Sequence, residues 1–260
     1  RDYYASRGLG DVYKRQAYQY VKAGLIAVAV DNPGSGELAD LETEAKSYAY
    51  DFQTFARSLL ELGWNYLGYS SYTNQHILNW MKHHPLMRKD RLIVSGFSFG
   101  TEPLMALGNM DESIYAFVYN DFLCRTRERD LVLTMPDEKG RRGWPNDISH
   151  LIPAFLCNFD FPDLVAALAP RPVICTEGGL DRDLNLVKRA YELAGHPENF
   201  TFYHYKDLQD STKRKNLMTL PEGLDGETYF KLVNVQPENH YFKSEYIIPW
   251  IKELLEKDHQ

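Results

Sequence analysis

The chain lacks several features that would assign it to a functional class at once. Its 260 residues contain only 3 cysteines, Cys124, Cys157 and Cys175, so the sequence has no disulfide framework. No apolar run approaches the roughly 20 residues that span a membrane. The 8 histidines form no H-E-x-x-H motif and no Cys/His ligand spacing. The net charge is −7 and the sequence has no stripe of Lys and Arg, which disfavours nucleic acid as a binding partner. We therefore expect no metal, no nucleic-acid partner and no membrane span.

What is present describes an ordinary globular chain. Hydrophobic residues make up 44% and charged residues 25% of the sequence, and the length fits one α/β domain. Short apolar runs alternate with segments of helical spacing, which predicts a mostly parallel sheet flanked by helices. The predicted strands cover residues 25–30, 91–95, 113–119, 172–176 and 200–205. The predicted helices cover residues 17–23, 45–62, 71–84, 101–107, 146–156, 161–168 and 245–255, and one more begins near Leu184.

The most informative stretch is Gly96-Phe97-Ser98-Phe99-Gly100. It follows a short apolar run and precedes a helical segment, which is the setting of a nucleophile elbow. A serine on such a tight turn exposes its hydroxyl, and side chains two positions before and after it would collide with the strand and helix, which favours glycine. We predict Ser98 as a nucleophile and the N–H of Phe99 as an oxyanion donor. The alternative is a strand-to-helix turn without chemistry.

The partners of such a serine follow in the order serine, acid, histidine. Asp181 lies on the loop after the strand predicted at residues 172–176. His240 lies in a loop before a terminal amphipathic helix. A histidine there can act as general base, and a carboxylate can orient it. The sequence therefore predicts a catalytic triad of Ser98, Asp181 and His240.

Other carboxylates compete for the role of acid. Glu177 lies at the end of the same strand that precedes Asp181, and Asp121 follows the earlier strand at residues 113–119. Asp181 also suits the N-cap of the helix that follows it, and a lone histidine in a loop is usually only solvated. We rank Asp181 first, Glu177 second and Asp121 third. Geometry must decide among them, because the acid has to hydrogen-bond the imidazole nitrogen that faces away from the serine.

These segments together resemble a known family. The chain is similar to the α/β-hydrolase branch that includes dienelactone-hydrolase-like proteins and bacterial proteins described as acetyl xylan esterases, a group found beside polysaccharide-uptake genes in gut and rumen bacteria. The resemblance runs from about Tyr18 to the end. It is carried by residues 27–37, 94–103, 119–124, 169–174, 176–181 and 239–242. It implies an α/β-hydrolase fold, chemistry without a cofactor, and a periplasmic or secreted location.

The resemblance also implies a function. The expected protein is a serine carboxylic-ester hydrolase that deacetylates a plant polysaccharide or oligosaccharide. The same triad can process another acyl substrate, such as a dienelactone, a uronate ester or a peptide. A third alternative is a non-catalytic carbohydrate-binding protein with a hydrolase-like fold, which the presence of Ser98, an acid and His240 disfavours. No feature of the sequence indicates an oligomeric state.

The first residues differ from the rest of the chain. Residues 1–16 have no apolar periodicity and resemble a translated sequencing adaptor, so we treat them as a non-native leader and residues 17–260 as the domain. In the related proteins, three strands and a His-Gly-type loop with an oxyanion donor precede the strand that corresponds to residues 25–30. We therefore expect an N-terminally truncated domain that catalyses poorly, since loss of one donor typically costs about 10²–10³ in rate.

Two long segments interrupt the alternation of strands and helices. The first, residues 121–170, is too long for a plain crossover, and the second, residues 207–236, separates the last predicted strand from His240. Loops at the carboxyl edge of a parallel sheet often set specificity, so we expect the first excursion to lie over the active site. The alternative is a solvated surface loop.

Overall fold

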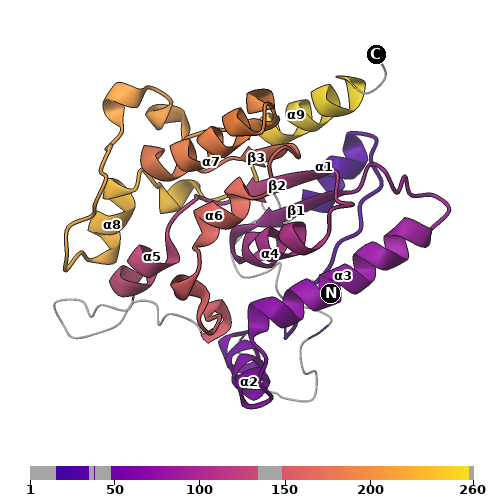
Figure 1. The fold of residues 1–260 in the computed structure, drawn as a ribbon, viewed down its shortest axis with the longest axis horizontal. Coiled ribbons are helices and arrows are strands. Elements are labelled where there is room, and N and C mark those ends of the chain that lie inside the picture. Colours follow the sequence, from indigo (N-terminus) through magenta and orange to yellow (C-terminus); the bar gives the residue numbers. More distant parts are fainter. Residues whose placement is uncertain (1–15, 35–37, 39–47, 134–147, 258–260) are drawn as a thin grey trace.

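A parallel sheet forms the centre of the molecule (Figure 1). A computed structural model describes residues 16–34, 38, 48–133 and 148–257 of the chain. Within them, the strands pair in the order β1-β2-β3-β4 and all run parallel, as predicted. Their bounds are β1 Ile93–Phe97, β2 Ala116–Asn120, β3 Val173–Cys175 and β4 Phe200–Phe202. The register pairs Phe97 with Asn120 and Tyr119 with Cys175, so the residues that follow β1, β2 and β3 meet at one edge.

Helices flank the sheet on both sides (Figure 1). Their bounds are α1 Gln16–Lys22, α2 Tyr48–Glu61, α3 Tyr66–His83, α4 Glu102–Met110, α5 Thr126–Leu133, α6 Phe161–Ala166, α7 Asp181–Leu193, α8 Gly226–Leu232 and α9 Ser244–Lys257. Most predicted helices are confirmed with small changes at their ends. The helix predicted at residues 71–84 begins earlier, as α3, because the side chain of Asn65 accepts the N–H of Gly68 and caps it.

The two faces of the sheet carry separate hydrophobic cores. One face, which includes Phe117 and Tyr119, packs against α3, α4, α6 and α7. The opposite face packs against α1 and α9, which contact each other. The buried residues of this second core are Tyr20, Val118, Ile174, Phe242, Ile247 and Ile251. All five positions of β2 are buried, as expected for a parallel strand that is covered on both faces.

The two excursions meet at one end of the molecule, where α5 of the first contacts α8 of the second (Figure 1). A third hydrophobic cluster fills this junction, and it also takes in residues from the loops that follow β3 and β4. Its buried members are Val132, Leu180, Tyr205, Tyr229, Val233 and Val235. The excursions therefore pack onto the carboxyl edge of the sheet. Residues 134–147 of the first excursion lie outside the described residues.

The prediction of a buried strand at residues 25–30 is wrong. These residues form no strand, and Ile26, Val28 and Val30 are exposed. Leu25 and Ala27 pack against the core between α1, α9 and the sheet. A strand needs a hydrogen-bonded neighbour, and nothing in the described part of the chain pairs with this segment. The apolar run is therefore packed on one side only.

The helix predicted at residues 146–156 is also wrong. The described part of this segment holds only two short 3-10 turns, Ile148–His150 and Phe155–Cys157. Between them stands Pro153, which has no N–H to donate to a carbonyl one turn earlier and so disfavours an uninterrupted helix here. Ala154 then turns the chain with a φ of 61°. The apolar residues that suggested a helix pack instead as separate turns.

Two further expectations concern the N-terminal leader and membrane-spanning helices. Of the leader predicted at residues 1–16, only Gln16, the first residue of α1, lies within the described residues. The helices that the structure describes include none long and apolar enough to cross a membrane.

Candidate active site

Ser98 lies on a strained turn at the carboxyl end of β1. Its φ of 54° falls in the left-handed region, which residues other than glycine rarely adopt. The chain passes from β1 through a 3-10 turn, Ser98–Thr101, directly into α4. Such strain persists only where the surrounding structure imposes it. A strand-to-helix turn with a serine at its apex has the geometry of a nucleophile elbow.

The two glycines of the motif differ in their surroundings. A Cβ on Gly96 would lie 2.5 Å from the carbonyl oxygen of Gly100 and 2.7 Å from Cα of Thr101, so the turn closes onto this position. A Cβ on Gly100 would meet no described atom within 4 Å. The expected steric need for glycine therefore holds at Gly96 and not at Gly100.

His240 lies beside the elbow. Its ring stacks on Phe97, the residue before Ser98, with ring centroids 4.6 Å apart and planes inclined by 26°. The hydrogen bonds of the described residues include none between Ser98 and His240. Catalytic hydrogen bonds are often long before substrate binds and tighten in the complex. The fold thus brings the predicted nucleophile and the predicted base to the same edge of the sheet.

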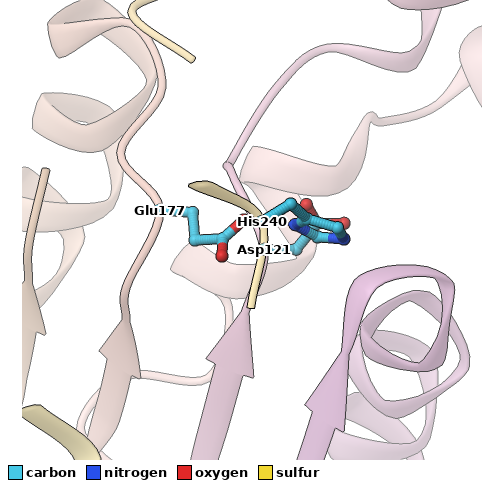
Figure 2. Close-up of side chains that lie close together, drawn as sticks. All are labelled: Asp121, Glu177 and His240. Carbon is cyan, nitrogen blue, oxygen red and sulfur yellow. Dashed lines mark hydrogen bonds and ion pairs between the residues drawn. The ribbon is translucent and has the colours of Figure 1, made fainter. Parts of the chain in front are cut away.

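The carboxylate that meets His240 is that of Glu177, the acid ranked second from the sequence. Nδ1 of His240 lies 2.5 Å from Oε2 of Glu177 (Figure 2). Glu177 is fully buried just beyond β3, and His240 comes from the loop before α9. Because Nδ1 is held by the carboxylate, the other ring nitrogen, Nε2, is left to exchange a proton with a substrate or nucleophile.

Glu177 is held by donors on both of its carboxylate oxygens. Oε2 also accepts the hydroxyl of Tyr205 at 3.2 Å. Oε1 accepts the side-chain amide of Asn120 at 3.1 Å and the backbone N–H of Tyr241 at 3.3 Å. The ammonium of Lys243 lies 3.4 Å from the same oxygen. A carboxylate is stable in a buried position only when it is paired and hydrogen-bonded, and these contacts also fix its orientation.

Asp121, the third candidate acid, lies close to the same histidine (Figure 2). Burial raises the pKa of its carboxyl to about 7, the imidazole of His240 opposes this shift, and Glu177 adds to it. Atoms of Asp121, Glu177 and His240 that could bind a cation all lie within 4.8 Å of one another. His240 and Glu177 already hydrogen-bond each other, and Lys243 supplies a positive charge beside them. The donor set therefore fits a hydrogen-bonded network better than a metal.

The electrostatics of the site favour a basic imidazole. Burial acts to lower the pKa of His240, but the hydrogen bond to Glu177 and the negative charges of Asp121 and Glu177 outweigh it, so the pKa is raised. The positive charge of Lys243 opposes this increase. A raised pKa makes the neutral imidazole a stronger proton acceptor.

Asp181, the acid ranked first from the sequence, lies in a different ion-pair cluster. It is the first residue of α7. Its carboxylate meets the guanidinium of Arg214 at 3.2 Å and Nε2 of His204 at 3.3 Å. Arg214 belongs to the excursion at residues 207–236, so Asp181 ties that excursion to α7. The structure therefore brings Glu177, and not Asp181, to His240.

A buried ion pair supports the elbow from the side of α4. Glu102, the first residue of α4, accepts the guanidinium of Arg129 at 2.9 Å and lies 2.9 Å from Nδ1 of His150. The ring of His150 contacts Phe99 with centroids 4.5 Å apart. Arg129 and His150 both come from the excursion at residues 121–170. Part of that excursion is therefore fastened beside the predicted oxyanion donor.

Sequence reasoning missed three residues that hold Glu177, namely Asn120, Tyr205 and Lys243. Asn120 is a polar residue at the end of a strand whose other residues are apolar, and this pattern is the signal that would have found it. Tyr205 follows β4, and Lys243 stands three positions after His240. Nothing in the sequence distinguishes these two from the many other tyrosines and lysines.

A parallel sheet with a nucleophile elbow and an acid–histidine pair at its carboxyl edge defines the α/β-hydrolases. The chain belongs to the Abhydrolase family, whose model matches residues 10–253. The resemblance drawn from the motifs is confirmed at this level. No curated protein matches the chain significantly.

Among solved structures, the chain is similar to a Bacteroides fragilis protein that bears the provisional name acetyl xylan esterase, with 61% identity and a TM-score of 0.86 over 92% of this chain and 62% of that one. The chain thus spans less than two thirds of that relative's length. A glucuronoyl esterase from Caldicellulosiruptor kristjansonii is 17% identical, with a TM-score of 0.37 over 62% of this chain and 55% of that one. A Klebsiella pneumoniae protein provisionally named dienelactone hydrolase is 11% identical, with a TM-score of 0.34 over 74% and 59%.

Proposed function

We propose that the chain is a serine carboxylic-ester hydrolase. The observation that carries the proposal is the left-handed Ser98 at the elbow, with His240 stacked on the neighbouring Phe97 and hydrogen-bonded to the buried Glu177. Ser98 is the proposed nucleophile, His240 the general base and Glu177 the acid that orients it. Glu177 takes the role that the sequence alone gave first to Asp181.

The proposed reaction has two steps. Nε2 of His240 takes the proton of the Ser98 hydroxyl, the serine oxygen attacks the ester carbonyl, and the N–H of Phe99 donates to the developing oxyanion. His240 then gives its proton to the departing alcohol, which leaves an acyl-serine. In the second step His240 takes a proton from water, the resulting hydroxide attacks the acyl group, and Ser98 is released with its proton restored. No cofactor enters either step.

The proposed substrate is an acetylated plant polysaccharide or oligosaccharide. Its support is the similarity to the Bacteroides fragilis protein, whose provisional name refers to acetyl xylan. An acetyl ester suits the two-step scheme, because the sugar hydroxyl is the leaving alcohol and acetate is the second product.

A fluorophosphonate probe and an acetate assay test the proposal separately. The chain should be labelled by the probe, should hydrolyse p-nitrophenyl acetate, and should release acetate from acetylated xylan. Ser98→Ala should abolish all three, while Ser113→Ala, at an exposed position before β2, should leave all three unchanged. Labelling that persists in Ser98→Ala would move the nucleophile elsewhere. Hydrolysis of p-nitrophenyl acetate without release of acetate from xylan would retain the mechanism and reject the substrate.

A further inference from the structure

Lys243 is a buried cation that the two-step reaction does not use. Its residue is 3% exposed, in the short connection between His240 and α9. Lysine is almost never fully buried unless its ammonium is paired, because removing the charge from water is costly. Its presence at the centre of the candidate active site therefore calls for a reason within that site.

The ammonium of Lys243 is surrounded by groups of the histidine loop and by Glu177. It donates a hydrogen bond to the backbone carbonyl of Asn239, the residue before His240. It lies 3.4 Å from Oε1 of Glu177 and 3.2 Å from the ring centroid of Tyr241. The ion pair and the cation–π contact stabilise the charge, and both place it beside the acid–histidine pair.

The backbone of Lys243 is fixed as well, through Asn120 at the end of β2. The side-chain oxygen of Asn120 accepts the N–H of Lys243 at 2.6 Å. Its amide donates to Oε1 of Glu177 and to the carbonyl of Tyr241, at 3.1 Å in each case. Asn120 is fully buried. One amide thus joins β2, the acid and the histidine loop, which keeps the ammonium of Lys243 on the Oε1 side of Glu177.

We propose that Lys243 is a positioning residue of this site: its ammonium holds Oε1 of Glu177, so that Oε2 faces His240, and it adds a positive charge next to the imidazole. The inference rests on the proposed function and names a residue that acts through Glu177 and His240 without touching the substrate. It differs from a purely structural role, because a charge beside the general base changes how activity depends on pH.

The charged and titratable groups that face His240 come from several elements. Glu177 follows β3, Asp121 follows β2, and Lys243 lies on the loop of His240 itself. Tyr205, after β4, donates to Glu177, and the side facing β1 is the apolar ring of Phe97. Two carboxylates raise the pKa of His240, and Lys243 opposes them. Removing the ammonium should therefore raise the pKa of His240 further.

The test compares pH profiles of kcat/KM for esterase activity. In Lys243→Met the acidic limb should move upward by about 0.5–1 pH unit. One pH unit below the wild-type limb, the activity of the variant, normalised to its own plateau, should therefore be about 3–10-fold lower than the normalised activity of the wild type. Lys243→Arg keeps the charge and should keep the wild-type limb. The matched control is Lys82→Met. It removes another partly buried lysine, whose ammonium lies 2.7 Å from the carboxylate of Asp111 at the amino end of the sheet. It should lower stability without moving the limb.

A second measurement is independent of turnover. In a Ser98→Ala background, the pKa of His240, followed by NMR, should rise when Lys243 is replaced by Met. If the melting temperature shows that Lys243→Met is unfolded, Lys243→Gln takes its place. An unchanged limb together with an unchanged pKa of His240 would overturn the inference. Absence of any activity that depends on Ser98, with the shift in the pKa of His240 present, would overturn the proposed function and leave the role of Lys243 standing.

Discussion

Nδ1 of His240 lies 2.5 Å from Oε2 of Glu177, across 63 positions of sequence. Glu177 immediately follows Thr176, one residue beyond β3, whereas Asp181 is already in α7. The carboxylate that meets His240 is thus the one nearest the end of the strand. Its donors come from β2, from the segment after β4 and from the histidine loop, so that the pair is fixed from three sides.

Replacing Glu177 and Asp181 one at a time should show which of the two carboxylates supports catalysis. Glu177→Gln keeps the size of the side chain but removes the charge that orients His240, so we expect kcat to fall by about 10³–10⁴. Asp181→Asn breaks the pair with Arg214 and leaves the described contacts of His240 with Glu177 and Phe97 in place, so it should change kcat by no more than several-fold while lowering the melting temperature. Steady-state kinetics and thermal unfolding of both variants make the comparison. The reverse order of effects would return the role of acid to Asp181.

The pH dependence of the wild type follows from the raised pKa of His240. The histidine must be neutral to accept the serine proton, and its pKa lies above the ordinary value of about 6.5. Activity should therefore fall as the pH drops through a limb that lies above 6.5. The profile of kcat/KM between about pH 5 and 9 measures it. In the residual activity of Glu177→Gln the limb should move down, since the hydrogen-bonded anion that raises the pKa is gone.

The sequence predicts those parts of the fold and site whose signals are local. The G-x-S-x-G turn between an apolar strand and a helix predicts the position of Ser98, and the apolar run at residues 113–119 predicts β2. The choice between Glu177 and Asp181 depends on contacts that are distant in sequence, since Asp181 pairs with Arg214, 33 positions away, and Glu177 pairs with His240, 63 positions away. The strand predicted at residues 25–30 is wrong for the same reason. Its apolar pattern is a local signal, whereas a strand also needs a hydrogen-bonded partner from elsewhere in the chain, and the described residues provide none.

The two glycines of the elbow form a matched pair. Gly96→Ala should destabilise the protein by about 1–3 kcal/mol and reduce activity, because its Cβ would lie 2.5 Å from the carbonyl oxygen of Gly100. Gly100→Ala adds the same methyl group where no described atom lies within 4 Å, so it should cost far less. Chemical denaturation of both variants checks the difference. Equal losses at the two positions would contradict the argument, because the added methyl group is crowded at Gly96 and not at Gly100.

The ion pair behind the elbow should matter for stability. Arg129→Met leaves the carboxylate of Glu102, which is 3% exposed, with His150 as its remaining partner among those described. We expect a loss of about 3 kcal/mol, the low end for breaking a buried pair. The double variant Glu102→Gln/Arg129→Met removes the buried charge and should recover part of the loss. Denaturation of the wild type, both single variants and the double variant gives the coupling free energy, and a coupling near zero would contradict the argument.

Asp121 provides the counterpart to Lys243. Its pKa is raised to about 7, and the pKa of His240 beside it is raised above its ordinary value. Interacting groups lose their protons in two shared steps, so the acidic limb of the wild type should be broader than a single ionisation. Asp121→Asn keeps the oxygen that accepts the N–H of Phe122 but removes the negative charge beside the imidazole. The limb should sharpen and move to lower pH, opposite in sign to Lys243→Met. Asp90→Asn, at an exposed carboxylate, is the control and should leave the limb in place. A limb that moves upward in Asp121→Asn would show that Asp121 does not stabilise the charged imidazole, and the assignment of charges around His240 would then be wrong.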